Sequence, residues 1–317
     1  MFTMLHSSSG KLLVDGFWYE HSERRDRGRS QEGKIELSPF MQNRTQKLRL
    51  LLALTRRDYV VQFAGAGLGI GWLFIQYLFQ IALFFLIFGV VLGGDNSSDL
   101  GVESRRLTGP GFLNYLLGAM TLWLPLSEMI QRSGSILSEN RSLIRRTPGA
   151  LDAMSAVPLV QALFHFSILF IASCAIAWMS PLYSEVSATS GGPATFPVPT
   201  LPLAYLTGIV FLLICHPLSL YLQRVSVLLK DLSPILRLLL QILFWSTPMV
   251  YVVNRADILE IMSWNPLFCM VDVQRYLTYD LPMQSPALSG LICLVAVSII
   301  AGVLSRFRLR EVSADFL

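Results

Sequence analysis

The segment Gly28-Arg29-Ser30-Gln31-Glu32-Gly33-Lys34 has the glycine and lysine spacing of a phosphate-binding loop. In such a loop the next residue is Ser or Thr, whose hydroxyl binds Mg²⁺, and an apolar strand comes before the glycine. Here the next residue is Ile35, and residues 22–27 are mostly charged. We therefore reject the motif and expect this chain to bind no ATP.

The histidines and cysteines lack the spacing of a catalytic or metal site. No HExxH, GxSxG or CxxC motif is present, and three of the four cysteines lie in apolar segments, which is typical of buried free thiols. His165 and His216 fall in different apolar segments, and we interpret each as packed or hydrogen-bonded inside a bundle of helices. We expect no catalytic residue, no metal and no cofactor in this chain.

Glu128 and Arg132 could form an ion pair. They are four residues apart, a spacing at which opposite charges pair along a helix. The sequence therefore predicts a structural pair, and the alternative is an interface pair that contributes little stability.

Aromatic side chains gather in two apolar segments, residues 68–92 and 236–253. Such rings could stack on sugar rings without using charge. The alternative is that they pack inside the protein or face lipid. The candidates for a path are Tyr77, Phe84, Phe88, Phe244 and Tyr251.

The elements that position these side chains are predicted from six long runs without Asp, Glu, Lys or Arg. They are residues 59–94, 107–127, 153–184, 186–223, 238–254 and 281–305. The shortest run has 17 residues, or about 25 Å of helix, which is near the lower limit for crossing a membrane. Barrel strands would alternate polar and apolar residues, so we expect helices. The six spans are predicted at 68–92, 111–129, 154–179, 202–222, 236–253 and 285–304.

Composition agrees with an all-α integral membrane protein. The chain has 317 residues, of which 53% are hydrophobic and 15% are charged, whereas soluble domains carry about 25% charged residues. This excludes an ordinary soluble enzyme, a disulfide scaffold and a disordered protein. A net charge of +4 does not indicate binding to nucleic acid.

The Lys and Arg residues predict the orientation of the chain. An even number of spans places both termini on one side, where 21 of the 25 basic residues fall, and the opposite loops hold 4. By the positive-inside rule we expect both termini to be cytoplasmic.

Four regions are expected along the chain. Residues 1–39 form a cytoplasmic extension that we expect to be disordered, and its apolar stretch at residues 12–14 is too short for a signal peptide. Residues 40–62, where basic residues recur among leucines, predict an amphipathic helix in the membrane interface. Residues 63–305 are the six-span domain, and residues 306–317 are a cytoplasmic tail. Within 254–284, apolar residues interrupted by Asn265-Pro266 predict short re-entrant helices before the last span.

Several segments, in order, resemble the membrane subunit of a type-2 ABC transporter, in the branch that exports O-antigen, capsule or teichoic acid. The resemblance covers roughly residues 45–312. It departs from the family at the N-terminal extension, at Lys230 where Arg is commoner, and at Gly149 where an aromatic residue often follows the proline. The segments that carry it are residues 54–59, 63–65 and 69–72 (LTRRDY, FAG, GIGW), 125–133 (PLSEMIQRS), 139–148 (ENRSLIRRTP), 227–232 (VLLKDL), 246–251 (STPMVY) and 264–267 (WNPL).

The resemblance implies a homodimeric permease in the bacterial inner membrane that works with two copies of a separate ATP-binding subunit. ATP and Mg²⁺ would bind to that partner, and the substrate would be a lipid-linked polysaccharide. Residues 131–153 would form the cytoplasmic coupling loop, and 56–58 would belong to the interface helix. The implied coupling residues are Glu139, Asn140, Arg141, Arg145 and Arg146, and the implied interface-helix residues are Arg56, Arg57 and Asp58.

Two other functions fit parts of the sequence. One is a type-2 exporter of another lipid or small amphiphile, although such relatives often carry a large outer domain for which the loops here are too short. The other is a membrane enzyme that acts on lipid-linked sugars, which needs acidic residues near the membrane surface. The acidic cluster available for that is Asp257, Glu260, Asp272 and Asp280, on the expected outer side.

Overall fold

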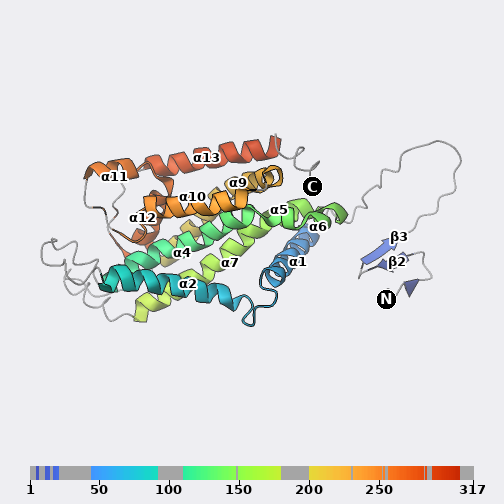
Figure 1. Ribbon diagram of the computed structural model, residues 1–317, viewed down its shortest axis with the longest axis horizontal. Coiled ribbons are helices and arrows are strands. Elements are labelled where there is room, and N and C mark those ends of the chain that lie inside the picture. Colours follow the sequence, from blue (N-terminus) through green and yellow to red (C-terminus); the bar gives the residue numbers. More distant parts are fainter. Residues whose placement is uncertain are drawn as a thin grey trace. The chain divides into compact units, whose positions relative to one another are not determined.

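The computed structural model describes residues 5–6, 11–14, 17–20, 44–91, 110–147, 149–179, 200–229, 231–251, 253, 256–281, 283 and 288–307. The chain divides into two compact units, Met1–Gln42 and Asn43–Leu317, which we treat separately. Figure 1 labels the elements of both units.

The first unit contains three short antiparallel strands, β1 (Leu5–His6), β2 (Lys11–Val14) and β3 (Phe17–Glu20). Val14 pairs with Phe17, and Leu13 pairs with Trp18. These strands differ from the disorder expected for residues 1–39. The described residues have a physical reason to form strands, because Val14, Phe17, Trp18 and Tyr19 are residue types that favour strands. Residues 21–39 of the predicted extension lie outside the described residues.

The second unit is a bundle of helices, and six of its helical segments occupy the six predicted spans. They are α2 (Gly71–Phe84) with its π-helical continuation η2 (Phe85–Val91), α4 (Pro110–Ser133), α7 (Ala150–Met179), α9 (Leu201–Leu228), α10 (Leu232–Ser246) and α13 (Leu288–Phe307). Within the described residues, Gly71–Val91, Ala150–Ile176 and Leu201–Leu228 are long and apolar enough to cross a membrane. Two more helical stretches, Leu232–Ser246 and Ser289–Ser305, are apolar but shorter. That six helices cross the membrane stays a prediction.

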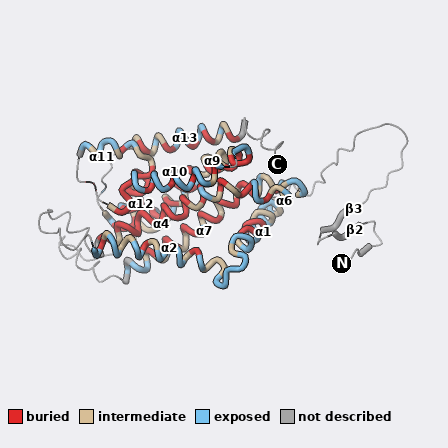
Figure 2. Tube along the Cα trace, viewed as in Figure 1, coloured by how far each residue is buried: buried red, intermediate tan, exposed pale blue. Residues whose placement is uncertain are grey.

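Helix α4 forms the centre of the bundle. It packs against α7, α9, α10 and α12 (Pro266–Tyr279), and nearly all of its residues from Phe112 to Ile130 are buried, as Figure 2 shows in red. A helix surrounded by protein can carry polar groups, and α4 carries Thr121, Ser127 and Glu128. This explains why α4, although 24 residues long, is not among the described helices that are apolar enough to cross a membrane.

Helix α10 ends earlier than the predicted fifth span, 236–253. It stops at Ser246, and the next two residues are Thr247 and Pro248. Thr247 has extended backbone (φ −110°, ψ 134°). The proline after it favours this conformation and has no backbone N–H, which favours the end of the helix at this point. The predicted span extends past this break because it was drawn from the absence of charged residues, and that criterion does not consider proline.

Two short helices follow the break, α11 (Ala256–Met262) and α12 (Pro266–Tyr279). The side chain of Asn265 accepts a hydrogen bond from the Leu267 N–H and caps α12, whose first residue is Pro266. Both helices lie where re-entrant helices were predicted. Helix α12 is largely buried against α4, α9 and α13, and its entry into the membrane stays a prediction.

The predicted interface helix is α1 (Arg44–Gln62), which packs on α7. Leu54 is buried in a small apolar cluster with residues of α7 and of α5 (Ile136–Glu139), while Leu48 and Leu52 are exposed. A short helix, α6 (Arg141–Arg146), follows α5. The link from α1 to α2 contains Gly65 and Gly69 at φ of 85° and 53°, a conformation that favours glycine.

Candidate functional site at the inner ends of α1, α4 and α7

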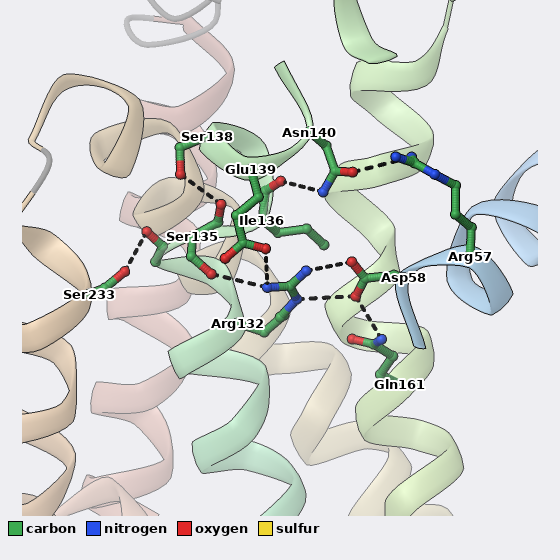
Figure 3. Close-up of polar contacts among 11 residues, drawn as sticks. Arg57, Asp58, Arg132, Ser135, Ile136, Ser138, Glu139, Asn140, Gln161 and Ser233 are labelled. Carbon is green, nitrogen blue, oxygen red and sulfur yellow. Dashed lines mark hydrogen bonds and ion pairs between the residues drawn. The ribbon is translucent and has the colours of Figure 1, made fainter. Parts of the chain in front are cut away.

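Arg132 lies near the end of α4 and binds Asp58 of α1 through two hydrogen bonds (Figure 3). Its Nε is 3.1 Å from Oδ2, and its Nη2 is 2.5 Å from Oδ1. The Asp58 side chain is only 1% exposed, and the amide of Gln161 on α7 donates to its Oδ2 over 2.9 Å. A buried carboxylate is stable only when it is paired and hydrogen-bonded, so these contacts lock together the C-terminal parts of α1 and α4 and the N-terminal half of α7.

The same guanidinium also holds the predicted coupling loop. Nη1 of Arg132 donates to Oγ of Ser135 over 3.1 Å and to Oε2 of Glu139 over 2.7 Å. Burial alone would raise the pKa of the Glu139 carboxyl, but the hydrogen bond from Ser135 and the charge of Arg132 together lower it below its ordinary value. Glu139 is therefore ionised at neutral pH, and Arg132 bridges a carboxylate on α1 and another on α5.

A second contact links α1 to the same loop. Nη1 of Arg57 donates to the side-chain oxygen of Asn140 over 3.2 Å, and the Asn140 amide donates to the Ile136 carbonyl over 2.9 Å. We call this set the inner joint. It consists of Arg57, Asp58, Arg132, Ser135, Glu139, Asn140 and Gln161.

The structure does not form the predicted pair between Glu128 and Arg132. Arg132 faces Asp58 and Glu139, while Glu128 accepts a hydrogen bond from the Tyr77 hydroxyl and lies 3.2 Å from Nδ1 of His165. Spacing along one helix could not show this, because the competing carboxylate of Asp58 is 74 residues away in the sequence.

His165 is completely buried and joins α1 to α4. Its Nε2 lies 2.7 Å from the hydroxyl of Tyr59 on α1. Burial, together with the charges of Glu128 and Asp58, raises the pKa of Tyr59 above its usual value, so the phenol stays protonated. When the phenol donates to Nε2, the Nδ1–H is left to donate to Glu128. The interpretation of His165 as hydrogen-bonded inside the bundle is confirmed, and Tyr59 and Gln161 are partners that sequence reasoning missed.

The remaining predicted coupling and interface residues lie on the surface. Arg145 and Arg146 on α6 and Arg56 on α1 are exposed, and Arg141 is half-buried. No contact to a partner tests these residues, so their role in coupling stays a prediction.

The predicted path aromatics pack mainly on one another within the chain. Phe84 stacks on Phe244 with ring centroids 5.3 Å apart, and Phe88 lies 6.4 Å from Phe84. Tyr77 and Phe244 are buried, and the Tyr251 hydroxyl donates to the Trp245 carbonyl over 2.8 Å. These contacts match the packing alternative, and a path between two copies of the chain stays a prediction.

A cavity of about 670 Å³ opens beside the inner joint, between α1, α2, α4 and α10. Most of its lining is polar. The lining residues are Gln62, Leu73, Gln76, Tyr77, Gln80, Leu124, Ser127, Glu128, Gln131, Arg132, Ser135, Glu139, Ser233 and Arg237. Across the described part of the chain, no group of three or more His, Cys, Asp or Glu residues is placed to hold a metal ion.

These features define a multi-pass helical membrane protein in which a buried ionic cluster joins α1, α4 and α7. No protein-family model matches the chain. A relative from Myxococcus xanthus, described as the O-antigen export system permease protein RfbA, is 22% identical over 255 residues, which cover 79% of this chain and 87% of the relative. This similarity confirms the predicted resemblance to type-2 ABC permeases of the O-antigen export family.

Proposed function

We propose that this chain is the transmembrane subunit of an ATP-driven exporter of a lipid-linked polysaccharide of the O-antigen, capsule or teichoic acid class. Two copies would form the permease in the bacterial inner membrane, and two copies of a separate subunit would bind ATP and Mg²⁺. The name of the relative supports the transport class.

The inner joint is the observation that carries this proposal. An exporter driven by a separate ATPase needs a cytoplasmic loop that cannot bend independently of the spans. Arg132 connects Glu139 of α5 to Asp58 of α1 and belongs to α4 itself, and Gln161 adds α7. A force applied to α6 would therefore move the inner ends of α1, α4 and α7 as one body.

The basic residues support the proposed orientation. Helix α6 follows α5 directly and adds Arg141, Arg145 and Arg146, in the loop between the second and third predicted spans. This side of the membrane holds 21 of the 25 Lys and Arg residues, which favours a cytoplasmic position where a soluble ATPase could dock.

Deleting the chain in its host tests the function. We expect the surface polysaccharide to disappear and lipid-linked polymer to accumulate in the cytoplasmic leaflet, and we expect the wild-type chain to restore export. The chain, purified through a tag, should bring down an ATPase subunit whose hydrolysis rises with carrier-linked glycan. An unchanged surface polysaccharide after deletion would contradict the proposal.

A further inference from the structure

The cavity beside the inner joint has an unusual chemical character for a membrane protein. Only two of its fourteen lining residues, Leu73 and Leu124, are aliphatic. Four are glutamines, contributed by three different helices: Gln62, Gln76, Gln80 and Gln131. A volume of about 670 Å³ lies within the range of small-ligand sites, about 300–1,000 Å³.

The glutamines of α2 lie within a segment that is otherwise suited to lipid. Gln76 and Gln80 are inside Gly71–Val91, which is long and apolar enough to cross a membrane. With Leu73 and Tyr77 they occupy positions i, i+3, i+4 and i+7, which is one face of the helix. Neither amide makes a hydrogen bond to any of the residues that the structure describes. An amide within an apolar spanning helix is costly without a hydrogen-bond partner, so the side chains of Gln76 and Gln80 need a polar partner in the cavity that they line.

Most of the charged groups around the cavity are already paired or hydrogen-bonded within the protein. Arg132 is held by Asp58 and Glu139, and Glu128 by Tyr77 and His165. What remains for a ligand is chiefly a set of uncharged amides, with Arg237 exposed on α10. A side-chain amide donates and accepts hydrogen bonds, as does a sugar hydroxyl.

We propose that the side-chain amides of Gln62, Gln76, Gln80 and Gln131 bind the hydroxyl groups of an uncharged carbohydrate segment in this cavity. The inference rests on the proposed function and assigns the cavity to its substrate. It differs from the path predicted from aromatic residues, because Phe84 and Phe244 are stacked on each other and the cavity lining supplies hydrogen bonds instead.

Removing two amides while keeping side-chain length gives the first test. In Gln76→Met/Gln80→Met, we expect the initial rate of polysaccharide export to fall roughly tenfold, as the loss of two hydrogen bonds predicts. The matched control is Gln241→Met on α10, an exposed glutamine that does not line the cavity, and it should export at the wild-type rate. The amount of chain in the membrane and of copurified ATPase shows whether each variant folds.

Thiol protection gives a direct test of contact that does not depend on the double variant. A membrane-permeant maleimide should label Gln80→Cys several-fold more slowly in cells that make the polymer than in cells whose polymer synthesis is blocked. Gln241→Cys should label equally in both, and the parent chain with its four native cysteines gives the background.

The outcomes separate this inference from the proposed function. Protection of Gln80→Cys together with slower export by the double variant supports the amide site. Equal labelling in the two kinds of cell overturns it, whatever the export rate, and so does wild-type export by a folded double variant. If the amide site is overturned in this way, the loss of surface polysaccharide after deletion of the chain still supports its proposed function as an exporter. If the surface polysaccharide is unchanged after deletion, the proposed function is itself contradicted.

Discussion

Arg132 has a role that a single positive charge could not fill. Its guanidinium presents several N–H donors in one plane, and it binds two oxygens of Asp58, the hydroxyl of Ser135 and a carboxylate oxygen of Glu139. Lysine carries a compact charge and cannot reproduce this planar arrangement. The inner joint therefore depends on arginine geometry as well as on charge.

Replacing Arg132 should destabilise the chain because it leaves Asp58 buried without a cation. For Arg132→Ala we expect a loss of about 3–5 kcal/mol in the free energy of unfolding, with Arg132→Lys intermediate. Thermal unfolding in detergent or nanodiscs ranks the variants by stability. Arg49→Ala on the exposed face of α1 is the control and should change stability by less than about 0.5 kcal/mol. A variant Arg132→Ala as stable as this control would contradict the joint.

Glu139 should make the stability of the joint depend on pH. Its pKa is lowered in the folded chain, so it contributes stability that is present above its unfolded pKa and is lost as pH falls through the folded one. Wild type should be more stable than Glu139→Gln at neutral pH, and the difference should shrink as pH falls below about 4.3. Melting temperatures of both proteins across this range measure the effect. A difference that is independent of pH would show that Glu139 does not act as a carboxylate.

At the scale of elements, the C-terminal end of α10 is held by a buried arginine. Nη2 of Arg275 on α12 donates to the carbonyls of Pro248 and Met249 over 3.0 and 2.9 Å, and its Nε donates to the Tyr115 carbonyl over 3.0 Å. Its guanidinium also lies 3.4 Å from the centre of the Tyr115 ring. The carbonyls of two residues just after α10 thus receive donors from α12, which fixes the end of α10, α4 and α12 together.

Gly118 makes this arrangement possible and gives a test of it. A Cβ at this position of α4 would lie 2.8 Å from Cγ of Arg275 and 3.3 Å from its Cα. Gly118→Ala should therefore displace α12 and cost about 1–3 kcal/mol in the free energy of unfolding. Gly67→Ala is the matched control, since a Cβ there meets no atom within 4 Å. If the two variants melt alike, the close contact with Arg275 does not hold the helices together.

The helices could be predicted from the sequence, but most contacts between them could not. Charge-free runs located six helical segments because an apolar helix in lipid must lack charge over its length. Counting charges gave no sign that Arg275, within the predicted re-entrant segment 254–284, is among the most deeply buried side chains of the described residues. Five residues of the inner joint were singled out one by one from the sequence, namely Arg57, Asp58, Arg132, Glu139 and Asn140, whereas Ser135 and Gln161 were not. Their partners were missed because Asp58 and Arg132 meet through tertiary packing across 74 residues.

At the scale of the whole molecule, the distribution of basic residues predicts which face of the membrane each loop occupies. Ser138 lies on α5 in the basic loop, and Ser187 falls in the loop between the third and fourth predicted spans, outside the described residues. A thiol reagent that cannot cross membranes should label Ser187→Cys in intact cells or spheroplasts and should label Ser138→Cys only after lysis. Labelling of Ser138→Cys from outside would reverse the proposed orientation.

The proposed coupling to an ATPase depends on the charge of the surface that α6 presents. Arg145 and Arg146 are exposed at the end of this short helix and Arg141 begins it, so a soluble partner would meet three positive charges next to the inner joint. Changing all three to Glu should leave the chain inserted but reduce copurification of the ATPase and stop export, because attraction across the interface becomes repulsion. Changing all three to Lys keeps the charge and should retain most of the binding. Copurification of the ATPase and polysaccharide export are measured for both variants. Wild-type copurification and export by the triple Glu variant would show that the ATPase binds elsewhere.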